Sequence, residues 1–255
     1  MLERIRGFFA GREPRGSGHR AAASSFHLWW DLPRTGPVLE VAVVLEVEEP
    51  PVVERLYFWA LQVGFSDDGG TRPGGAHIGL QWNPANPGHG AVNWGGYASQ
   101  QRGGAILQGS ASGLPSARQD PNTRDYPWLP GRRYRLRVTP TPEERGWWRG
   151  TVTDLHTGTE TVVRDLHGGG SRLVDPVVWS EVFADCDDPR VAVRWSDFRV
   201  VDATGKRFAP RGLRVNYQAP ERGGCPNTNS VVVGGTAIQA TNSERVIPQG
   251  ASLRL

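Results

Sequence analysis

The strictest pattern in this sequence is an alternation of apolar and basic residues between Arg132 and Thr141. The segment reads Arg-Arg-Tyr-Arg-Leu-Arg-Val-Thr-Pro-Thr, so that Tyr134, Leu136 and Val138 alternate with arginines. A β-strand turns successive side chains to opposite faces, whereas an α-helix repeats every 3.6 residues. The segment is therefore predicted to be a strand with one face in an apolar core and the other in solvent.

Similar β-prone segments recur at short intervals along the chain, and turn residues separate them. They are residues 24–30, 38–48, 55–65, 76–82, 91–97, 132–141, 146–155, 160–166, 176–183, 191–201, 213–217, 231–239 and a short segment near Leu253. The 33 glycines and 20 prolines suit a chain with many turns. No segment has the periodicity of an amphipathic helix. We predict an all-β fold, an antiparallel two-sheet sandwich of the jelly-roll, concanavalin-like kind.

Residues 1–23 are basic and rich in glycine, and they lack any periodicity. We expect them to form a flexible basic tail and residues 24–255 to form a single β-sandwich domain, since sandwiches of this length commonly fold as one unit. The apolar run at Phe8-Phe9-Ala10 is shorter than the core of a secretory signal, so the sequence as given carries no signal peptide.

The charge pattern does not indicate a nucleic-acid or membrane partner. The net charge is +3, and all but one (Lys206) of the 29 basic residues are arginines, spread evenly along the chain. No run of five or six basic residues occurs, so we predict no nucleic-acid binding. No apolar stretch approaches the length of a membrane span, so we predict no membrane partner.

Two cysteines occur, Cys186 and Cys225, and both lie in segments rich in turn residues. Two are too few for a disulfide framework or a structural zinc site. One hypothesis pairs them in a single disulfide, and the alternative leaves two unrelated thiols. A disulfide favours an oxidising compartment, which conflicts with the missing signal peptide.

Three stretches carry a resemblance to a known family. They are Tyr57–Ser66 with His77–Gln81, Trp148–Gly158, and Trp179–Phe183 with Cys186 and Val193–Phe198. Their order, over residues 26–245, resembles a bacterial family of uncharacterised domains (domain of unknown function 3472). The resemblance implies a lectin-like sandwich, often in exported, carbohydrate-associated proteins, and hence an extracytoplasmic location. It supplies no catalytic residues, and the segment Val92–Tyr97 departs from the family pattern.

The ten tryptophans point to carbohydrate, because sugar rings stack on indole. Trp59, Trp179 and Trp195 lie inside apolar strands and are expected in the core. Of the adjacent pair Trp147 and Trp148, one should be buried and the other exposed. The residues proposed to bind a glycan are Trp82, Trp94, Tyr97, His77, Gln81 and Asn93.

The leading functional hypothesis is a non-catalytic, lectin-like module whose partner is a polysaccharide or another glycan. The first alternative is a polysaccharide lyase or glycoside hydrolase of the jelly-roll type. Its catalytic candidates are His77 and Gln81, which share the face opposite Ile78 and Leu80 with Asn93 and Arg102. The second alternative is a structural or protein-interaction domain without a small ligand.

Carboxylates give weaker signals. Glycosidases need two carboxyl groups at a defined separation, and neither the Glu46/Glu48 pair nor Glu181 has an evident partner in the sequence. The acidic loop with Asp185, Asp187 and Asp188 is a candidate structural calcium site, although acidic turns are also common. No other cofactor is predicted.

Overall fold

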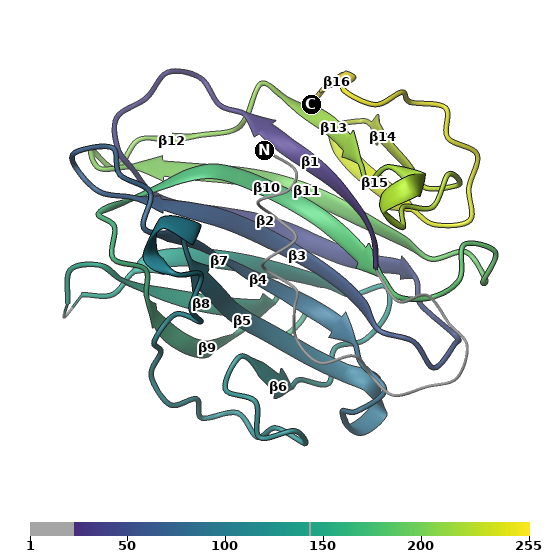
Figure 1. Cartoon of the computed structure of the whole chain (residues 1–255), viewed down its shortest axis with the longest axis horizontal. Coiled ribbons are helices and arrows are strands. Elements are labelled where there is room, and N and C mark those ends of the chain that lie inside the picture. Colours follow the sequence, from purple (N-terminus) through teal and green to yellow (C-terminus); the bar gives the residue numbers. More distant parts are fainter. Residues whose placement is uncertain (1–22, 143) are drawn as a thin grey trace.

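The computed structural model describes residues 23–142 and 144–255, and Figure 1 shows that these form stacked antiparallel sheets. The predicted all-β sandwich is thereby confirmed. Within the described residues there is no α-helix; three-residue 3-10 turns occur at η3 (Pro87–His89), η4 (Gln100–Arg102) and η5 (Pro220–Arg222). The predicted tail lies outside the described residues, apart from Ala23.

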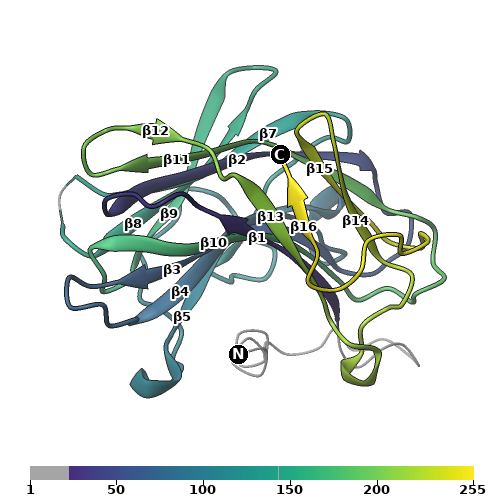
Figure 2. The same cartoon turned by 90° about the horizontal axis from the view of Figure 1, so that it is seen from above.

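The first sheet is the lower layer in Figure 2. Its strands, in spatial order, are β16 (Ser252–Arg254), β13 (Gly212–Tyr217), β1 (Ser24–Asp31), β10 (Arg172–Val182), β3 (Tyr57–Ser66), β4 (Gly74–Trp82), β5 (Gly90–Ala98) and β6 (Thr123–Asp125). β1 and β10 come from opposite ends of the sequence, so the centre of this sheet depends on long-range pairing.

The second sheet covers one face of the first. Its strands, in spatial order, are β14 (Asn229–Val233), β15 (Thr236–Ala240), β11 (Ala192–Asp202), β2 (Val38–Glu49), β7 (Arg133–Pro140), β8 (Trp147–Asp154) and β9 (Thr159–His167), and β12 (Arg207–Phe208) pairs with the end of β11. The two sheets join at one corner, where Leu173 of β10 pairs with Val38 of β2.

The core lies between the sheets and is filled by the inward residues of both. Phe65 of the first sheet stacks on Trp148 of the second, with ring centroids 5.7 Å apart. Gly150 of β8 lies against the indole of Trp94, where a Cβ atom would approach a ring carbon to 2.6 Å. Trp148 is the buried member of the Trp147/Trp148 pair, and Trp147 is half-buried. The alternation of faces along a strand thus predicted that the two indoles differ in burial. Which of them is buried depends on which face of β8 turns towards the core.

One predicted strand is in fact a hairpin. Residues 231–239 contain β14 and β15, and the turn between them is made by Gly234 and Gly235. Both glycines have positive φ, at 56° and 77°, which is the backbone of a two-residue hairpin turn. A similar difference concerns β10, which begins at Arg172 rather than at residue 176, because a bulge near Asp175 interrupts its register with β3.

The long segment between β5 and β6 closes one side of the sandwich. Residues 105–110 cross from β5 to β9, and we call them the side strap. Leu107 donates its N–H to the carbonyl of Gly96 on β5, and Ser110 donates to the carbonyl of Asp165 on β9. The side strap therefore hydrogen-bonds to the part of β5 that β6 does not cover, and to β9, the edge strand of the second sheet.

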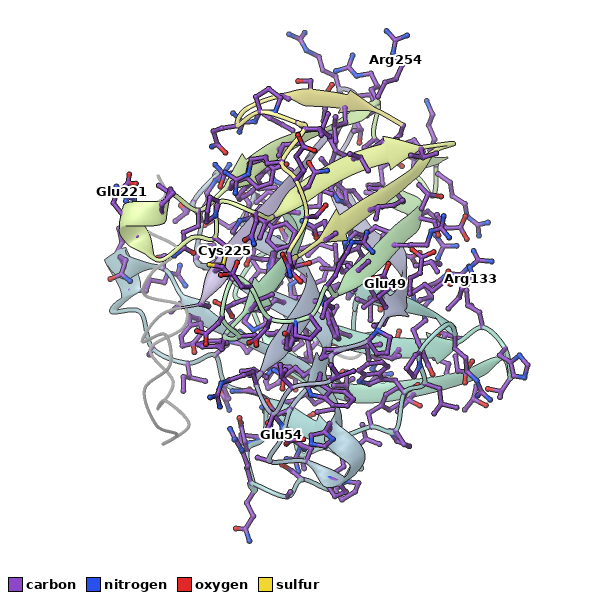
Figure 3. All side chains as sticks on the ribbon, turned by 90° about the vertical axis from the view of Figure 1, so that its right-hand side faces the viewer. Glu49, Glu54, Arg133, Glu221, Cys225 and Arg254 are labelled. Atoms are coloured by element: carbon purple, nitrogen blue, oxygen red, sulfur yellow. A yellow bond between two sulfur atoms is a disulfide. The ribbon has the colours of Figure 1, made fainter. Side chains whose placement is uncertain are left out.

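Cys186 and Cys225 form a disulfide with Cα atoms 5.4 Å apart, as one of the two sequence hypotheses predicted. The sulfur beside Cys225 is visible in Figure 3. The bond connects the loop after β10 with the loop after β13. The Cys225 N–H also donates to Ser24 Oγ at the start of β1. The disulfide thus fixes the end of β10 beside its neighbour β1.

Within the described residues, no helix is long and apolar enough to cross a bilayer.

Candidate functional site

The outer face of the first sheet is unlike the surface of a solvated sheet. In the middle of strands β1, β10, β3, β4 and β5, the residues turned to this face are buried or half-buried and none is Lys or Arg; Asp31 and Arg172 lie at strand ends. In Figure 2 the turns with η4 and η5 project from this side of the layer, near its two ends. An outer face with so few charged side chains is the kind of surface that a ligand or a partner covers.

Strand register places the outward residues in rows that run across the strands. The first row is Ser25, Glu181, Phe58, Gln81, Ala91 and Asp125, the second is His27, Trp179, Ala60, Gly79, Asn93 and Thr123, and the third is Trp29, Val177, Gln62, His77 and Gly95. Glu181 and Gln81 are therefore two strands apart in one row. Strand spacing separates their Cα atoms by roughly 10 Å.

Small residues in the second row make room for aromatic rings. Ala60 and Gly79 are neighbours there. The ring of Phe58, in the first row, packs against the rings of Trp179 and His77, with centroid distances of 4.9 and 5.4 Å. His77 and Trp179 are themselves 5.6 Å apart. The three rings form an apolar floor, with Glu181 on one side and Gln81 on the other.

Glu181 is the acidic residue beside this apolar floor. It is 4% exposed, and burial raises the pKa of its carboxyl group to about 8. Within residues 23–142 and 144–255, no Lys, Arg or His forms an ion pair with it. A buried acid without a counter-ion keeps its proton at neutral pH. Burial and the charges of Asp120 and Glu181 raise the pKa of Tyr97, which faces the same side from β5.

The two histidines of the face are buried in the neutral form. Burial lowers the pKa of His27 and of His77 to about 4, and for His77 a hydrogen bond with Asn93 acts in the opposite direction. A histidine with so low a pKa is a weak base at neutral pH. This removes the reason for choosing His77 as the catalytic base of a lyase.

We expect His27 to destabilise the protein in acid. Its folded pKa lies below its ordinary value of 6.5, so its contribution to stability is complete above pH 6.5 and is lost as the pH falls to 4. The loss is about 3 kcal/mol, at 1.36 kcal/mol per pKa unit. In urea unfolding at pH 7 and pH 4, His27→Phe should lose less stability between the two conditions than the native protein does. The exposed His156→Gln is the control, and an unchanged pH dependence in His27→Phe would refute the assignment.

The Gln81 side of the floor is polar and hydrogen-bonded. Asn83 Nδ2 donates to Gln81 Oε1 at 3.0 Å, and Asn93 Nδ2 donates to Thr123 Oγ1 at 2.8 Å. Trp128 Nε1 donates to the carbonyl of Gln81 at 2.8 Å, which fixes the backbone there. The face therefore has a proton-carrying acid on one side and amides held by hydrogen bonds on the other.

The structure brings together only part of the predicted ligand-binding set. His77, Gln81, Asn93 and Tyr97 share the outer face, as period-two spacing required. The prediction for Trp94 is wrong, because its side chain is fully buried in the core between the sheets.

Two further predicted residues also lie elsewhere. Trp82 packs against the core, and its ring stacks on His89 at 4.3 Å. Arg102 lies in η4, exposed, and not on a strand of the face.

The tryptophans do not form a solvent-facing groove. Seven of the ten are buried and three, at positions 29, 82 and 147, are half-buried. These three lie on the outer face of the first sheet, against the core and on β8, respectively. The indole platform on which the lectin hypothesis depended is therefore not assembled in the described residues.

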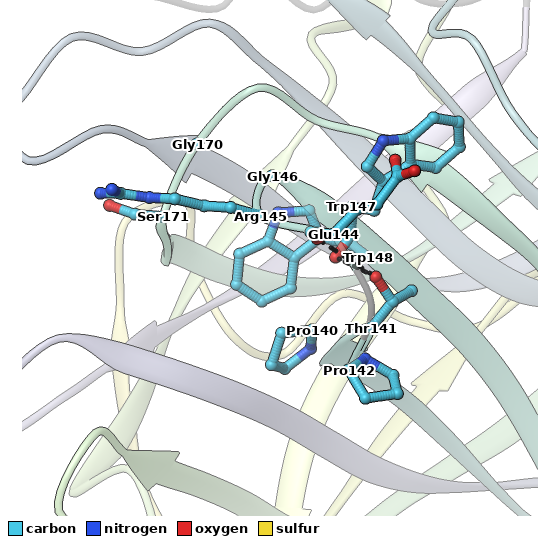
Figure 4. A pocket seen from close by; sticks show the side chains of 10 residues that line it. All are labelled: Pro140, Thr141, Pro142, Glu144, Arg145, Gly146, Trp147, Trp148, Gly170 and Ser171. Carbon is cyan, nitrogen blue, oxygen red and sulfur yellow. Dashed lines mark hydrogen bonds between the residues drawn. The ribbon is translucent and has the colours of Figure 1, made fainter.

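A small hollow of about 190 Å³ lies beside Trp147 (Figure 4). Pro140, Pro142 and Arg145 line it, and Trp147 also packs against His167 at 5.4 Å. None of the described residues that line it is a buried ionisable residue. It therefore offers a shallow contact surface.

The acidic loop after β10 is closed by its own hydrogen bonds. Asp188 Oδ2 accepts the N–H of Asp185 at 2.8 Å, and Asn242 Nδ2 donates to the carbonyls of Asp187 and Asp188. In the described part of the chain, no three His, Cys, Asp or Glu side chains are grouped so as to hold a metal ion. The calcium site at Asp185, Asp187 and Asp188 remains a prediction.

The chain is similar to known proteins in the shape of its backbone and not in its sequence. No family model and no curated protein matches the chain, so the resemblance to the uncharacterised family remains a prediction. Scytalido-glutamic peptidase, solved with a transition-state-analogue inhibitor, has a TM-score of 0.49 at 12% identity, covering 86% of this chain and 98% of that one.

Two other solved structures are similar. SCP-B, an eqolisin-family peptidase in complex with the tripeptide Ala-Ile-His, has a TM-score of 0.44 at 12% identity, covering 87% of this chain and 98% of that one. Alginate lyase Aly36B, a mutant in complex with alginate tetrasaccharide, has a TM-score of 0.30 at 13% identity, covering 58% and 60%. At such low identity and TM-score, these matches do not decide the function.

Glu181 is the main residue whose role the sequence did not reveal. It was visible as a strand carboxylate without a partner, and the strand order supplies its surroundings. The aromatic residues Phe58 and Trp179 look like ordinary core residues in the sequence. Only pairing of β10 with β1 and β3 places them on an outer face beside Glu181.

Proposed function

We propose that the protein is a hydrolase that cleaves an amide bond, with Glu181 as the proton-transferring group and Gln81 as the hydrogen-bond donor to the carbonyl oxygen. The observation that supports this most is the pKa of about 8 of the buried Glu181, in one row with Gln81. Amide hydrolysis needs a proton for the leaving nitrogen and stabilisation of the charge that develops on oxygen. In this proposal Glu181 supplies the proton, and the Gln81 amide supplies the hydrogen bond to the oxygen.

The chemistry balances with a single water molecule. The protonated Glu181 donates its proton to the carbonyl oxygen as water attacks the carbon, and the Gln81 N–H₂ group hydrogen-bonds to that oxygen. The resulting Glu181 carboxylate accepts a proton from the attacking water. That proton is passed to the nitrogen as the carbon–nitrogen bond breaks, and the oxygen returns the first proton to Glu181.

An amide fits the face better than a glycosidic bond. Glycosidases use two carboxyl groups roughly 5 to 9.5 Å apart. In the row of Glu181 the next carboxyl group is Asp125, which lies four strands away at roughly 19 Å. Asp125 also accepts hydrogen bonds from Asn86 Nδ2 and from the N–H of Ala117. The glycan partner that the sequence predicted remains a second prediction, and the experiment described next tests it as well.

The test exposes the full chain to a library of internally quenched peptides and to a panel of polysaccharides between pH 3 and pH 9. Peptide cleavage in H₂¹⁸O should place one ¹⁸O in the new carboxyl group. The rate should fall as the pH rises through about 8, where Glu181 loses its proton. Glu181→Gln should lower the rate about 10³-fold, whereas Glu160→Gln, on the second sheet, should not change it. Cleavage of glycans alone, or no cleavage at any pH, would refute the proposal.

The disulfide supports an oxidising compartment as the place of action. We therefore expect the protein to work outside the cytoplasm. Secretion into the medium or periplasm of its source cells, followed by thiol counting on the recovered protein, checks this expectation.

A further inference from the structure

Asn83 lies two residues after Gln81 and turns its side chain to the same outer face. Both side chains are nearly inaccessible, with 3% and 5% exposure. Asn83 Oδ1 accepts the backbone N–H of Ala85 at 3.1 Å, and Asn83 Nδ2 donates to Gln81 Oε1 at 3.0 Å. Three groups are thus connected in sequence: a backbone N–H, the Asn83 amide and the Gln81 amide.

The direction of this chain is fixed by its first member. A backbone N–H can only donate, so the Asn83 atom that faces Ala85 must be the oxygen. The other end of the Asn83 amide is then the donor, and the Gln81 atom that faces it must be an oxygen in turn. The Gln81 N–H₂ group is left pointing away from Asn83. Within the described residues, no carbonyl or side chain accepts a hydrogen bond from Gln81 Nε2.

We infer that Asn83 is a positioning residue, which holds the Gln81 amide so that its N–H₂ group and not its oxygen faces the substrate carbonyl. This inference rests on the proposed role of Gln81. A free glutamine amide has two orientations of similar energy, and one of them would place a lone pair against the substrate carbonyl oxygen. The backbone N–H of Ala85 removes that orientation through Asn83.

Asn83→Asp is the most informative variant. The aspartate keeps an oxygen for the Ala85 N–H, but its second oxygen accepts from Gln81 Nε2 and turns the Gln81 amide around. We expect kcat for the best peptide to fall about 100-fold at pH 7, the typical cost of one oxyanion donor, with KM changed less than twofold. A protonated aspartic acid donates again, so the defect should shrink as the pH falls. Asn83→Ser, which is too short to reach Gln81, should lose less and show no such recovery.

A double variant separates positioning from structure. In a Gln81→Met background, Asn83→Asp should lower kcat no further, because the group it orients is gone. An equal loss in both backgrounds, or a loss without pH-dependent recovery, would overturn the inference. If Gln81→Met and Glu181→Gln themselves retain full activity, the proposed function fails instead.

A spectroscopic measurement is independent of turnover. The side-chain ¹⁵N–H₂ resonances of Gln81 are assigned by their loss in Gln81→Met. They should shift in Asn83→Asp at pH 7, when Nε2 donates to a carboxylate, and return towards the native position in acid. Unchanged resonances in a variant with native thermal stability would refute the positioning role.

Discussion

Glu181→Gln should unfold at higher denaturant concentration than the native protein at pH 8, and at nearly the same concentration at pH 4. The folded-state pKa of Glu181 is raised above its unfolded value, so stability is fully present below pH 4.5 and is lost as the pH rises to about 8. Glutamine has the shape of the protonated acid and never ionises. The difference between the two proteins should therefore grow by up to about 5 kcal/mol over this interval, at 1.36 kcal/mol per pKa unit.

The measurement is urea unfolding of both proteins at half-unit steps between pH 4 and pH 8. Glu221→Gln is the matched control, because Glu221 is exposed in η5 and projects from the surface in Figure 3. Parallel pH profiles for native protein and Glu181→Gln would show that Glu181 has an ordinary pKa. The same substitution is expected to lower the rate of hydrolysis about 10³-fold, so stability and activity should change in opposite directions.

Removal of the disulfide should cost about 2 to 4 kcal/mol of unfolding free energy, because the bond closes a loop of 39 residues in the unfolded chain. The double variant Cys186→Ser/Cys225→Ser and the reduced native protein should unfold at the same, lower urea concentration. Because the bond holds the end of β10 beside Ser24, the double variant should also lose hydrolytic activity before it unfolds. Equal midpoints for oxidised and reduced native protein would contradict the stabilising role.

The alternation of residues predicted much of this fold. Period-two patterns located nearly all strands, and they correctly put His77, Gln81 and Asn93 on one face. The same rule argues against grouping Asn93 with Trp94, because consecutive strand residues point to opposite faces. The error arose from judging Trp94 by the loops near it and not by its place in the strand.

The rest of the candidate site could not be predicted, because it depends on which strands become neighbours. Glu181 is separated by about 100 residues of sequence from Gln81 and by more from Ser25. Its environment exists only once β10 lies between β1 and β3. A local pattern identifies the two faces of a strand, but it does not tell which face the second sheet covers. That choice decides whether Trp179 belongs to the core or to the floor of the site.

The side strap has a further consequence, for solubility. Its hydrogen bonds occupy the free edge of β5 near Gly96 and the edge of β9 near Asp165. Open strand edges recruit other chains and lead to aggregation. A single proteolytic cut within residues 105–110 would free both edges at once, so a nicked molecule should associate with its own kind long before its core unfolds.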